Sequence, residues 1–259
     1  MKFKYILKLI FIPLFISFLI SLNFKNSGSC DKVLAVFVFN GNIIPQISNI
    51  GSVLKTLSPI IIFCIITGDY FYRFMTKTNV YSFIRYDSRN IFAIHKIIKH
   101  LSITFIFSAS YIVSGIYFNR INIFDKDVFE IIFICFIMLF SINIFFSVIM
   151  NICSFFCGNT ASFLYSMSLM AFLTIEYLVN DISDYKKFSL SKLNPIKNYT
   201  LNLHDSCYME KNEIWQLSFI EGFDFKFSII YFLILIVIMY LILFIIILKY
   251  DISISVNEE

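Results

Sequence analysis

Residues Phe227–Lys249 read FSIIYFLILIVIMYLILFIIILK, and no charged side chain lies between Lys226 and Lys249. A helix needs roughly 20 apolar residues to cross a bilayer, and this run is long enough. Similar runs recur along the chain, so that 59% of the residues are hydrophobic and 15% are charged. Soluble domains carry about a quarter charged residues. The sequence therefore predicts a helical membrane protein.

We expect six membrane-spanning helices, which together form a single all-α transmembrane domain over residues 1–259. The expected spans are about Tyr5–Leu22, Ser52–Tyr72, Leu101–Phe118, Val128–Met150, Thr160–Val179 and Phe227–Lys249. The first run has a basic start, as a signal peptide does, but we expect it to be retained as a span, because nothing downstream is typical of a secreted domain. Turns are expected over Asn119–Asp127 and Phe155–Asn159.

Lysine and arginine near the span ends predict the orientation. Lys2, Lys4 and Lys8 precede the first span. The cations between the second and third spans are Arg73, Lys77, Arg85, Arg89, Lys96 and Lys99. Both regions are expected to face the cytoplasm, which places both termini inside and residues 180–226 outside. Abundant Ile, Phe, Asn and Lys are typical of AT-rich bacterial genes, so we expect a multi-pass protein of the bacterial cytoplasmic membrane.

The expected outer segment, residues 180–226, mixes charges with aromatic and apolar residues such as Trp215 and Phe219. This composition is typical of interfacial or re-entrant helices before the last span, and an unstructured loop is equally compatible with it. Cys30 and Cys207 are both expected outside and could form a disulfide, although the composition favours free thiols. Cys153 and Cys157 are interpreted as packing residues and not as metal ligands.

Motifs for catalysis are missing from the sequence. It contains no phosphate-binding Gly-x-x-x-x-Gly-Lys-Ser/Thr loop, no clustered zinc ligands and no Gly-x-Ser-x-Gly elbow. We therefore expect no enzyme activity, no metal site and no nucleic-acid partner. Away from the ends of the expected spans, Glu176 is the one ionisable residue that qualifies as a functional charge in the membrane. It lies within about one turn of the outer end of the fifth span, where its carboxylate is expected to reach the lipid headgroups. This distribution argues against ion-coupled transport.

Polar residues repeat at helical spacing inside the expected spans. Asn143, Ser147 and Asn151 are four apart and so share one helical face, and Ser110 and Ser114 do the same on the preceding span. Amides in lipid seek partners, so the first face is expected to point into the bundle or towards a second subunit. Ordinary helix packing is the favoured interpretation over a substrate-lining surface, and both could hold at a subunit seam.

The segment Tyr81–His100, YSFIRYDSRNIFAIHKIIKH, joins the second and third spans. On a helical wheel Ile84, Ile91, Ile94 and Ile98 form one apolar stripe, and the basic residues and His100 occupy the other faces. We expect residues 79–100 to form a separate amphipathic helix that lies on the cytoplasmic membrane surface or docks a partner. The polar residues Asp87, Ser88 and Asn90 near its middle favour docking.

In these residues the chain resembles the membrane subunits of type-2 ATP-binding cassette (ABC) exporters, especially the bacteriocin- and lantibiotic-associated permeases. The resemblance is carried by Gly68-Asp69 after the second span and by Tyr81, Arg85, Ser88-Arg89 and Lys96. It also covers the six-span plan with a structured outer stretch before the last span. The Gly-Thr and Pro-x-x-Arg elements of many relatives are missing, which leaves the subfamily open.

The resemblance implies two permease subunits, as a homodimer or heterodimer, with two cytoplasmic ABC ATPase subunits that bind ATP and Mg²⁺. The chain itself then holds no cofactor. The residues implied in ATPase coupling are Tyr81, Arg85, Asp87, Ser88, Arg89 and Lys96. The residues expected to line the pathway or the subunit seam are Asn143, Ser147, Asn151, Ser110 and Ser114. An apolar, aromatic-rich pathway fits amphipathic antimicrobial peptides, in bacteriocin export or self-immunity, or lipid-like cargo.

Two other classes of protein remain open from the sequence. One is a non-transporting membrane immunity protein that binds a bacteriocin or shields its lipid target. The other is an accessory subunit of a larger membrane complex that uses the basic segment as a tether. An ATPase that co-purifies with the chain would distinguish the exporter from both.

Overall fold

The computed structural model describes residues 3–21, 50–76, 88–124, 126–179, 190–200, 204 and 223–249. Within these residues every regular element is helical. The elements are α1 (Phe3–Ser21), α4 (Ile50–Thr67), α5 (Tyr70–Thr76), α7 (Arg89–Asn119), α8 (Lys126–Val179), η2 (Leu190–Leu193), α9 (Pro195–Tyr199) and α11 (Phe225–Lys249). Four helical segments are long and apolar enough to cross a membrane: Thr56–Met75, Arg89–Asn119, Val128–Tyr177 and Phe225–Lys249. The all-helical class is confirmed, and these segments are those expected of a membrane protein.

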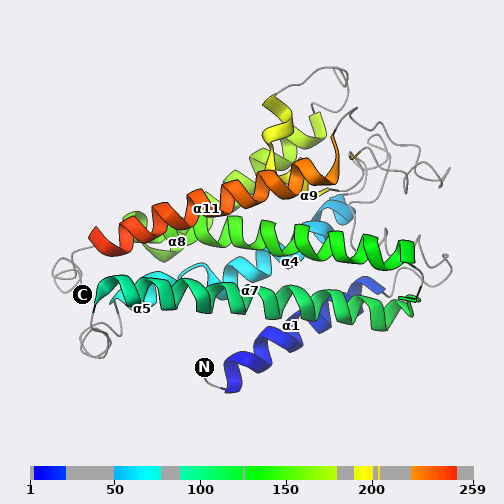
Figure 1. Cartoon of the computed structure of the whole chain (residues 1–259), viewed down its shortest axis with the longest axis horizontal. Helices are drawn as coiled ribbons and strands as arrows, with labels where there is room; N and C mark the ends of the chain where they lie inside the picture. Colours follow the sequence, from blue (N-terminus) through cyan, green and yellow to red (C-terminus); the bar gives the residue numbers. More distant parts are fainter. Residues whose placement is uncertain are drawn as a thin grey trace.

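The long helices α7, α8 and α11 lie side by side, which gives the bundle two ends (Figure 1). At one end Nη1 of Arg89, in the first turn of α7, donates a hydrogen bond of 3.0 Å to the carbonyl of Leu248, in the last turn of α11. At the same end α5 packs against the first turns of α7, where Lys96 lies over the ring of Phe74. The end of α7, the start of α11 and the short helix α9 lie at the opposite end (Figure 1).

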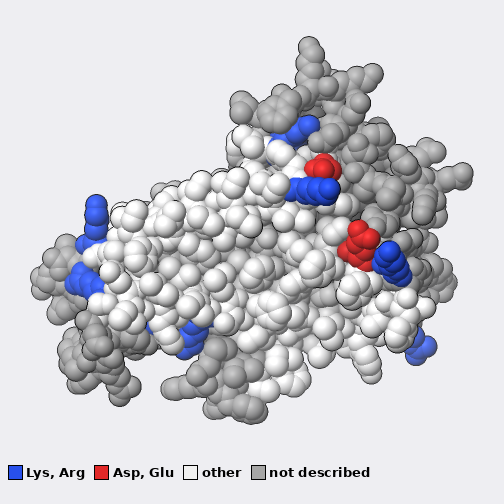
Figure 2. Space-filling model, in the orientation of Figure 1, with Lys and Arg blue, Asp and Glu red and all other residues white. Residues whose placement is uncertain are grey.

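The two ends differ in charge. Among the described residues, the end with Arg89 also carries Arg73, Lys96, Lys99 and Lys249, with Asp69 as its acid; we call it the basic end. The opposite end carries both signs, with Arg120, Lys126, Glu130, Glu176, Lys192, Lys197, Asp224 and Lys226. On the face drawn in Figure 2, the charged residues coloured at the left end are all Lys and Arg (blue), whereas the right end shows Lys and Arg together with Asp and Glu (red).

Helix α8 consists of two arms joined at Gly158. It has 54 residues, and its helical backbone is interrupted at Gly158, which has φ 73° and ψ 174°. A residue without a Cβ adopts positive φ without strain, so glycine permits this break. Asn159, after the break, contacts Asp69 at the basic end, whereas Leu173, further along the second arm, contacts α9 at the opposite end. The second arm therefore runs back along the bundle, and the turn expected over Phe155–Asn159 lies at Gly158.

Helix α7 corrects the prediction for residues 79–100. We expected a separate surface helix and a span that begins at Leu101, but the described residues from Arg89 to Asn119 form one helix of 31 residues. Ser88 caps its N-terminus, where Ser88 Oγ accepts a hydrogen bond of 3.3 Å from the Ile91 N–H. At 1.5 Å per residue α7 is about 47 Å long, more than the roughly 30 Å hydrocarbon layer.

The burial pattern of α7 explains why its first turns join the bundle. The stripe residues Ile91, Ile94 and Ile98 are exposed on the protein surface. The opposite face is buried and contains Phe92 and Phe107, which belong to the same apolar core as α5 and the end of α11. Packing of this face continues without a break past residue 100, so no turn separates a surface helix from the span. Residues Arg89–His100, which were expected to belong to a surface helix, are therefore the first three turns of α7.

The other elements follow the expected bounds closely, with one interruption. The second span was expected over Ser52–Tyr72, but α4 ends at Thr67 and α5 begins at Tyr70, with Gly68-Asp69 between them. In the outer segment the described pieces are η2, α9 and His204, and all five residues of α9 are buried. Cys64 and Cys135 are buried as expected, and Cys30 and Cys207 lie outside the described residues.

Candidate functional site: a buried polar cluster near the basic end

The polar face predicted on α8 lies inside the bundle. Asn143, Ser147 and Asn151 are all 0% exposed, which is one of the two locations expected for them. Asn143 Nδ2 donates a long hydrogen bond of 3.3 Å to Ser108 Oγ in α7. Ser147 and Asn151 lie nearer the basic end and contact α4, α5 and α7. We call these three residues and their partners the polar cluster.

His100 joins three helices within the polar cluster. Its Nε2 lies 2.7 Å from Ser147 Oγ in α8, and its Nδ1 lies 2.7 Å from the hydroxyl of Tyr240 in α11. Thr67 Oγ1, at the end of α4, lies 3.2 Å from Ser147 Oγ. A neutral imidazole has one donor and one acceptor nitrogen, and both are used here. Hydrogen bonds therefore connect α4, α7, α8 and α11 at one level of the bundle.

Aromatic rings surround this connection. The His100 ring lies 5.3 Å from Phe71, 5.7 Å from Tyr70 and 6.3 Å from Phe63, measured between ring centroids. One helical turn earlier, Nζ of the buried Lys96 lies 3.3 Å from the centroid of Phe74. Such a cation–π contact compensates in part for the loss of water around the ammonium. Two ionisable side chains of α7 thus point into the bundle.

Asn151 bridges the interruption between α4 and α5. Its Nδ2 donates a hydrogen bond of 2.9 Å to the carbonyl of Thr67, and its Oδ1 accepts one of 2.9 Å from the Phe71 N–H. One amide therefore satisfies a carbonyl and an N–H that the helix break would leave unpaired. Gly68 allows α8 to approach this closely, because a Cβ added there would lie 2.0 Å from Met150 Sδ.

Asp69 holds the two helix breaks together at the basic end. Its carboxylate accepts a hydrogen bond from Arg73 Nε one turn further along the chain. The same oxygen accepts one of 3.3 Å from Nδ2 of Asn159, the residue that follows Gly158. Asp69 is 9% exposed, so its charge is held mainly by protein donors. The break at Gly68-Asp69 and the break at Gly158 are therefore joined by side chains.

The residues predicted for ATPase coupling do not form one exposed surface in the described part of the chain. Ser88 is used as the α7 cap, and Arg89 is exposed but bonded to the carbonyl of Leu248. Lys96 is buried in the bundle, with 7% exposure, so it does not lie on the docking face expected for it. Tyr81, Arg85 and Asp87 lie outside the described residues.

The serines predicted on α7 lie away from the polar cluster. Ser114 is buried and donates a hydrogen bond of 2.8 Å to Ser17 Oγ in α1, and Ser17 donates one of 3.1 Å to the carbonyl of Tyr111. These contacts fix α1 against α7. Ser110, one turn before Ser114, is half-buried. The two serines therefore serve a helix contact that is separate from Asn143, Ser147 and Asn151.

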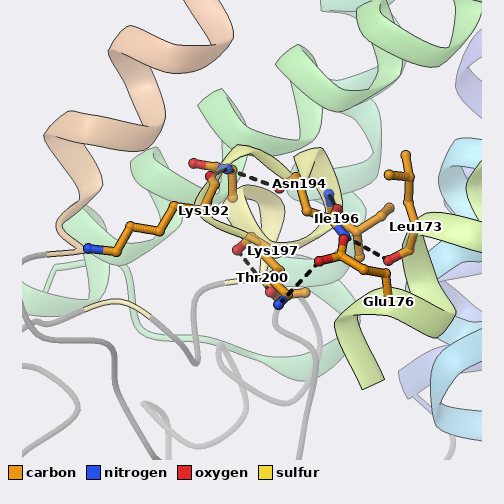
Figure 3. A network of polar contacts seen from close by, with 8 residues as sticks. Leu173, Glu176, Lys192, Asn194, Ile196, Lys197 and Thr200 are labelled. Atoms are coloured by element: carbon orange, nitrogen blue, oxygen red, sulfur yellow. Dashed lines mark hydrogen bonds and ion pairs between the residues drawn. The ribbon is translucent and has the colours of Figure 1, made fainter. Parts of the chain in front are cut away.

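A second polar group lies at the opposite end of the bundle (Figure 3). Glu176 accepts a hydrogen bond from Asn194, and its Oε1 lies 3.6 Å from Nζ of Lys197, whose side chain is 3% exposed. Asn194 also caps α9 through the Ile196 N–H. Glu176 was expected to reach the lipid headgroups; instead it pairs with a buried lysine, because a buried ammonium needs a nearby acceptor.

Further contacts attach α9 to the start of α11. The ring of His204 stacks on Phe223 with centroids 4.5 Å apart, and its Nε2 lies 2.7 Å from Ser228 Oγ. Ser228 in turn donates a hydrogen bond of 2.7 Å to Asn198 Oδ1. Burial raises the pKa of the Tyr199 hydroxyl well above its ordinary value, so Tyr199 is a neutral packing residue. The described part of the outer segment is thus packed onto the bundle.

Sequence reasoning missed His100 and Tyr240 as members of the polar cluster. His100 was assigned to the charged side of a surface helix. The signal against this was present, because residues 89–114 contain neither glycine nor proline to end a helix near residue 100. Tyr240 lies in a uniformly apolar run, and no pattern in the sequence distinguishes it from its neighbours.

The described residues contain no group of His, Cys, Asp and Glu side chains that could hold a metal ion. The polar cluster instead presents hydroxyls, amides and one imidazole, which form hydrogen bonds between helices. Comparisons with protein-family models, with curated proteins and with solved structures give no match for this chain.

Proposed function

We propose that this chain is the membrane-spanning permease subunit of an ATP-driven exporter similar to the type-2 ABC exporters, and that it crosses the membrane six times. Three crossings are assigned to α4 with α5, to α7 and to α11. The 54 residues of α8, divided at Gly158, suffice for two more, since one crossing takes roughly 20 residues. The shorter apolar helix α1 completes the set.

In this proposal the basic end faces the cytoplasm. Cytoplasmic segments of membrane proteins carry an excess of Lys and Arg close to the span ends. Lys2, Lys4 and Lys8 precede the first span, and the segment between the second and third spans carries Arg73, Lys77, Arg85, Arg89, Lys96 and Lys99. Both termini then lie on the cytoplasmic side of a bacterial cell membrane. The pieces η2 and α9 lie on the outer side, where the resemblance places re-entrant helices.

The observation that carries the proposal is the attachment of α5 and α7 to the polar cluster. These two helices flank residues 77–87, which contain Tyr81 and Arg85. On one side the Phe71 N–H of α5 bonds to Asn151, and on the other His100 of α7 bonds to Ser147. A partner that pulls on residues 77–87 therefore acts on α8 through two buried contacts. This is the connection that a permease driven by a separate ATPase requires.

The cargo proposed is an amphipathic peptide of the bacteriocin type, exported or cleared in self-immunity, or a lipid-like molecule. Exposed apolar side chains cover much of the bundle, as on α11 at Ile230, Leu233 and Leu241. Such surfaces suit lipid and apolar cargo. Two permease subunits, identical or related, and two ATPase subunits complete the assembly. The passage is then bordered from within each protomer by Asn143, Ser147 and Asn151, which are fully buried, whereas Ser110 and Ser114 lie at the separate contact between α7 and α1.

The test is purification from the native membrane in mild detergent, followed by mass spectrometry and ATPase assays. We expect an ABC ATPase to co-purify and its cargo-stimulated hydrolysis to be lost in Arg85→Glu. Lys226→Glu makes the same charge change at an exposed position of the opposite end and should leave stimulation intact. Arg89→Glu is a poorer probe, because it also breaks the bond to Leu248. A chain that purifies alone and folded would favour a non-transporting immunity protein and contradict the proposal.

A further inference from the structure

The buried face of the first arm of α8 changes character at Asn143. Towards the opposite end this face is apolar, with Val128, Ile131, Cys135 and Leu139 all buried. From Asn143 towards the basic end it is polar, with Asn143, Ser147, Asn151 and Ser154 all fully buried. At 1.5 Å per residue, Asn143 to Asn151 spans about 12 Å along the helix. The polar part therefore occupies only the half of the arm nearer the basic end.

Two amide oxygens at the limits of this polar part have no partner. Asn143 Oδ1 and Asn159 Oδ1 are buried from solvent and accept no hydrogen bond in the described structure. A buried polar atom without a partner costs about 1–3 kcal/mol. In folded proteins such atoms are normally bonded to internal water. A hydrogen-bond acceptor without a partner therefore lies at each limit of the polar cluster, and a small molecule that donates a hydrogen bond would satisfy it.

The basic end offers an entrance for that donor. Asn159 is only half-buried, and it contacts Asp69, a carboxylate that is paired with the exposed Arg73. Charged groups at this end keep water close to the interior. From Asp69 inwards, the polar side chains of Asn151, Ser147 and Asn143 follow in sequence. Beyond Asn143, the apolar face with Leu139 offers water no partner.

We propose that the polar cluster is an internal water-binding path, open to solvent at the basic end and closed at Asn143. The bound ligand is water, which donates a hydrogen bond to the Asn143 amide oxygen at the inner limit of the path. When the path is hydrated, the part of the bundle interior that excludes water is only the apolar half, between Asn143 and the opposite end. This inference does not depend on the exporter proposal, because it concerns one protomer and needs no ATPase.

The test is the reactivity of single cysteines toward a small hydrophilic methanethiosulfonate reagent, in a cysteine-free protein in lipid nanodiscs. Asn151→Cys, Ser147→Cys and Asn143→Cys should react, each at least about tenfold faster than Leu139→Cys, because a hydrated thiol ionises and a dry buried thiol stays inert. Leu139 is the matched control, one turn from Asn143 on the same buried face. Equal inertness at positions 143, 147 and 139 would overturn the path, as would equal reactivity.

A second measurement uses the protein without substitutions, so that its result does not depend on whether the cysteine variants fold. Hydroxyl radicals formed from bound water oxidise nearby methionine, so radiolytic footprinting can compare two buried methionines. Met150 lies in the polar half, against Gly68, and is 5% exposed, whereas Met138 lies in the apolar half and is 1% exposed. We expect faster oxidation of Met150 than of Met138. Equal, slow oxidation of both would contradict internal hydration even if the cysteine variants failed to fold.

Discussion

Replacement of Asn151 by leucine should weaken the bundle at the break between α4 and α5. The side chain keeps its number of heavy atoms but loses two hydrogen bonds of 2.9 Å to other helices, to the Thr67 carbonyl and from the Phe71 N–H, besides one of 2.8 Å to the Ser147 carbonyl of its own helix. Hydrogen bonds between membrane helices contribute about 0.6–2 kcal/mol each. The two together predict a loss of about 1–4 kcal/mol in the free energy of unfolding. The backbone groups at the break would find no other partner on α8.

Asn143→Leu is the matched control, because it makes the same chemical change on the same face of α8. Asn143 donates one long bond of 3.3 Å to Ser108, so its replacement should cost less than about 1 kcal/mol. The assay is reversible unfolding of both variants in mixed micelles under a denaturing detergent, with helicity measured by circular dichroism. Equal stabilities for the two variants would refute the bridging role of Asn151.

Three further predictions concern other contacts. Gly68→Ala should lower the free energy of unfolding by about 1–3 kcal/mol through overpacking, since its Cβ would lie 2.0 Å from Met150 Sδ and 2.6 Å from the backbone carbonyl oxygen of Cys64; the same substitution should cost less when it is made and measured in a Met150→Ala protein. Glu176→Gln should destabilise the protein more than Lys197→Met, because only the first leaves a buried ammonium without its counter-charge; a larger loss in Lys197→Met would count against the ion pair. Ser114→Ala should cost about 0.6 kcal/mol and increase proteolysis of α1, and unchanged digestion of α1 would speak against the serine contact between α1 and α7.

The sequence predicts the helices well because their main signal is local. An uninterrupted apolar run such as Phe227–Lys249 has few alternatives to a helix in lipid, and α11 spans Phe225–Lys249. The turn near Phe155–Asn159 was also predictable, because it contains Gly158. The break at Gly68-Asp69 is less evident, since it depends on Asn151, which lies 80 positions after Phe71 in the chain and satisfies the backbone groups that the break leaves unpaired.

The polar cluster was only half predictable. The spacing of Asn143, Ser147 and Asn151 gives their common face, but not their partners, which come from other helices. His100 was assigned to a surface because the charges around it, Lys96 and Lys99, dominate the local pattern. Tertiary packing of α7 against α5 and α11 overrides that pattern and turns Lys96 and His100 inward. The Glu176–Lys197 pair was missed for the same reason, since Lys197 belongs to a segment whose packing the sequence does not specify.

The most direct test of the arrangement is disulfide cross-linking between α4 and α8 in native membranes. Thr67→Cys with Ser147→Cys, in a cysteine-free chain with a protease site inserted within residues 77–87, replaces hydroxyls that lie 3.2 Å apart. We predict that oxidation keeps the two fragments joined after proteolysis, whereas Thr67→Cys with Leu139→Cys, placed about 12 Å further along α8, leaves them separate. Separate fragments from the first pair, or joined fragments from the second, would contradict a bundle assembled around Ser147 and His100.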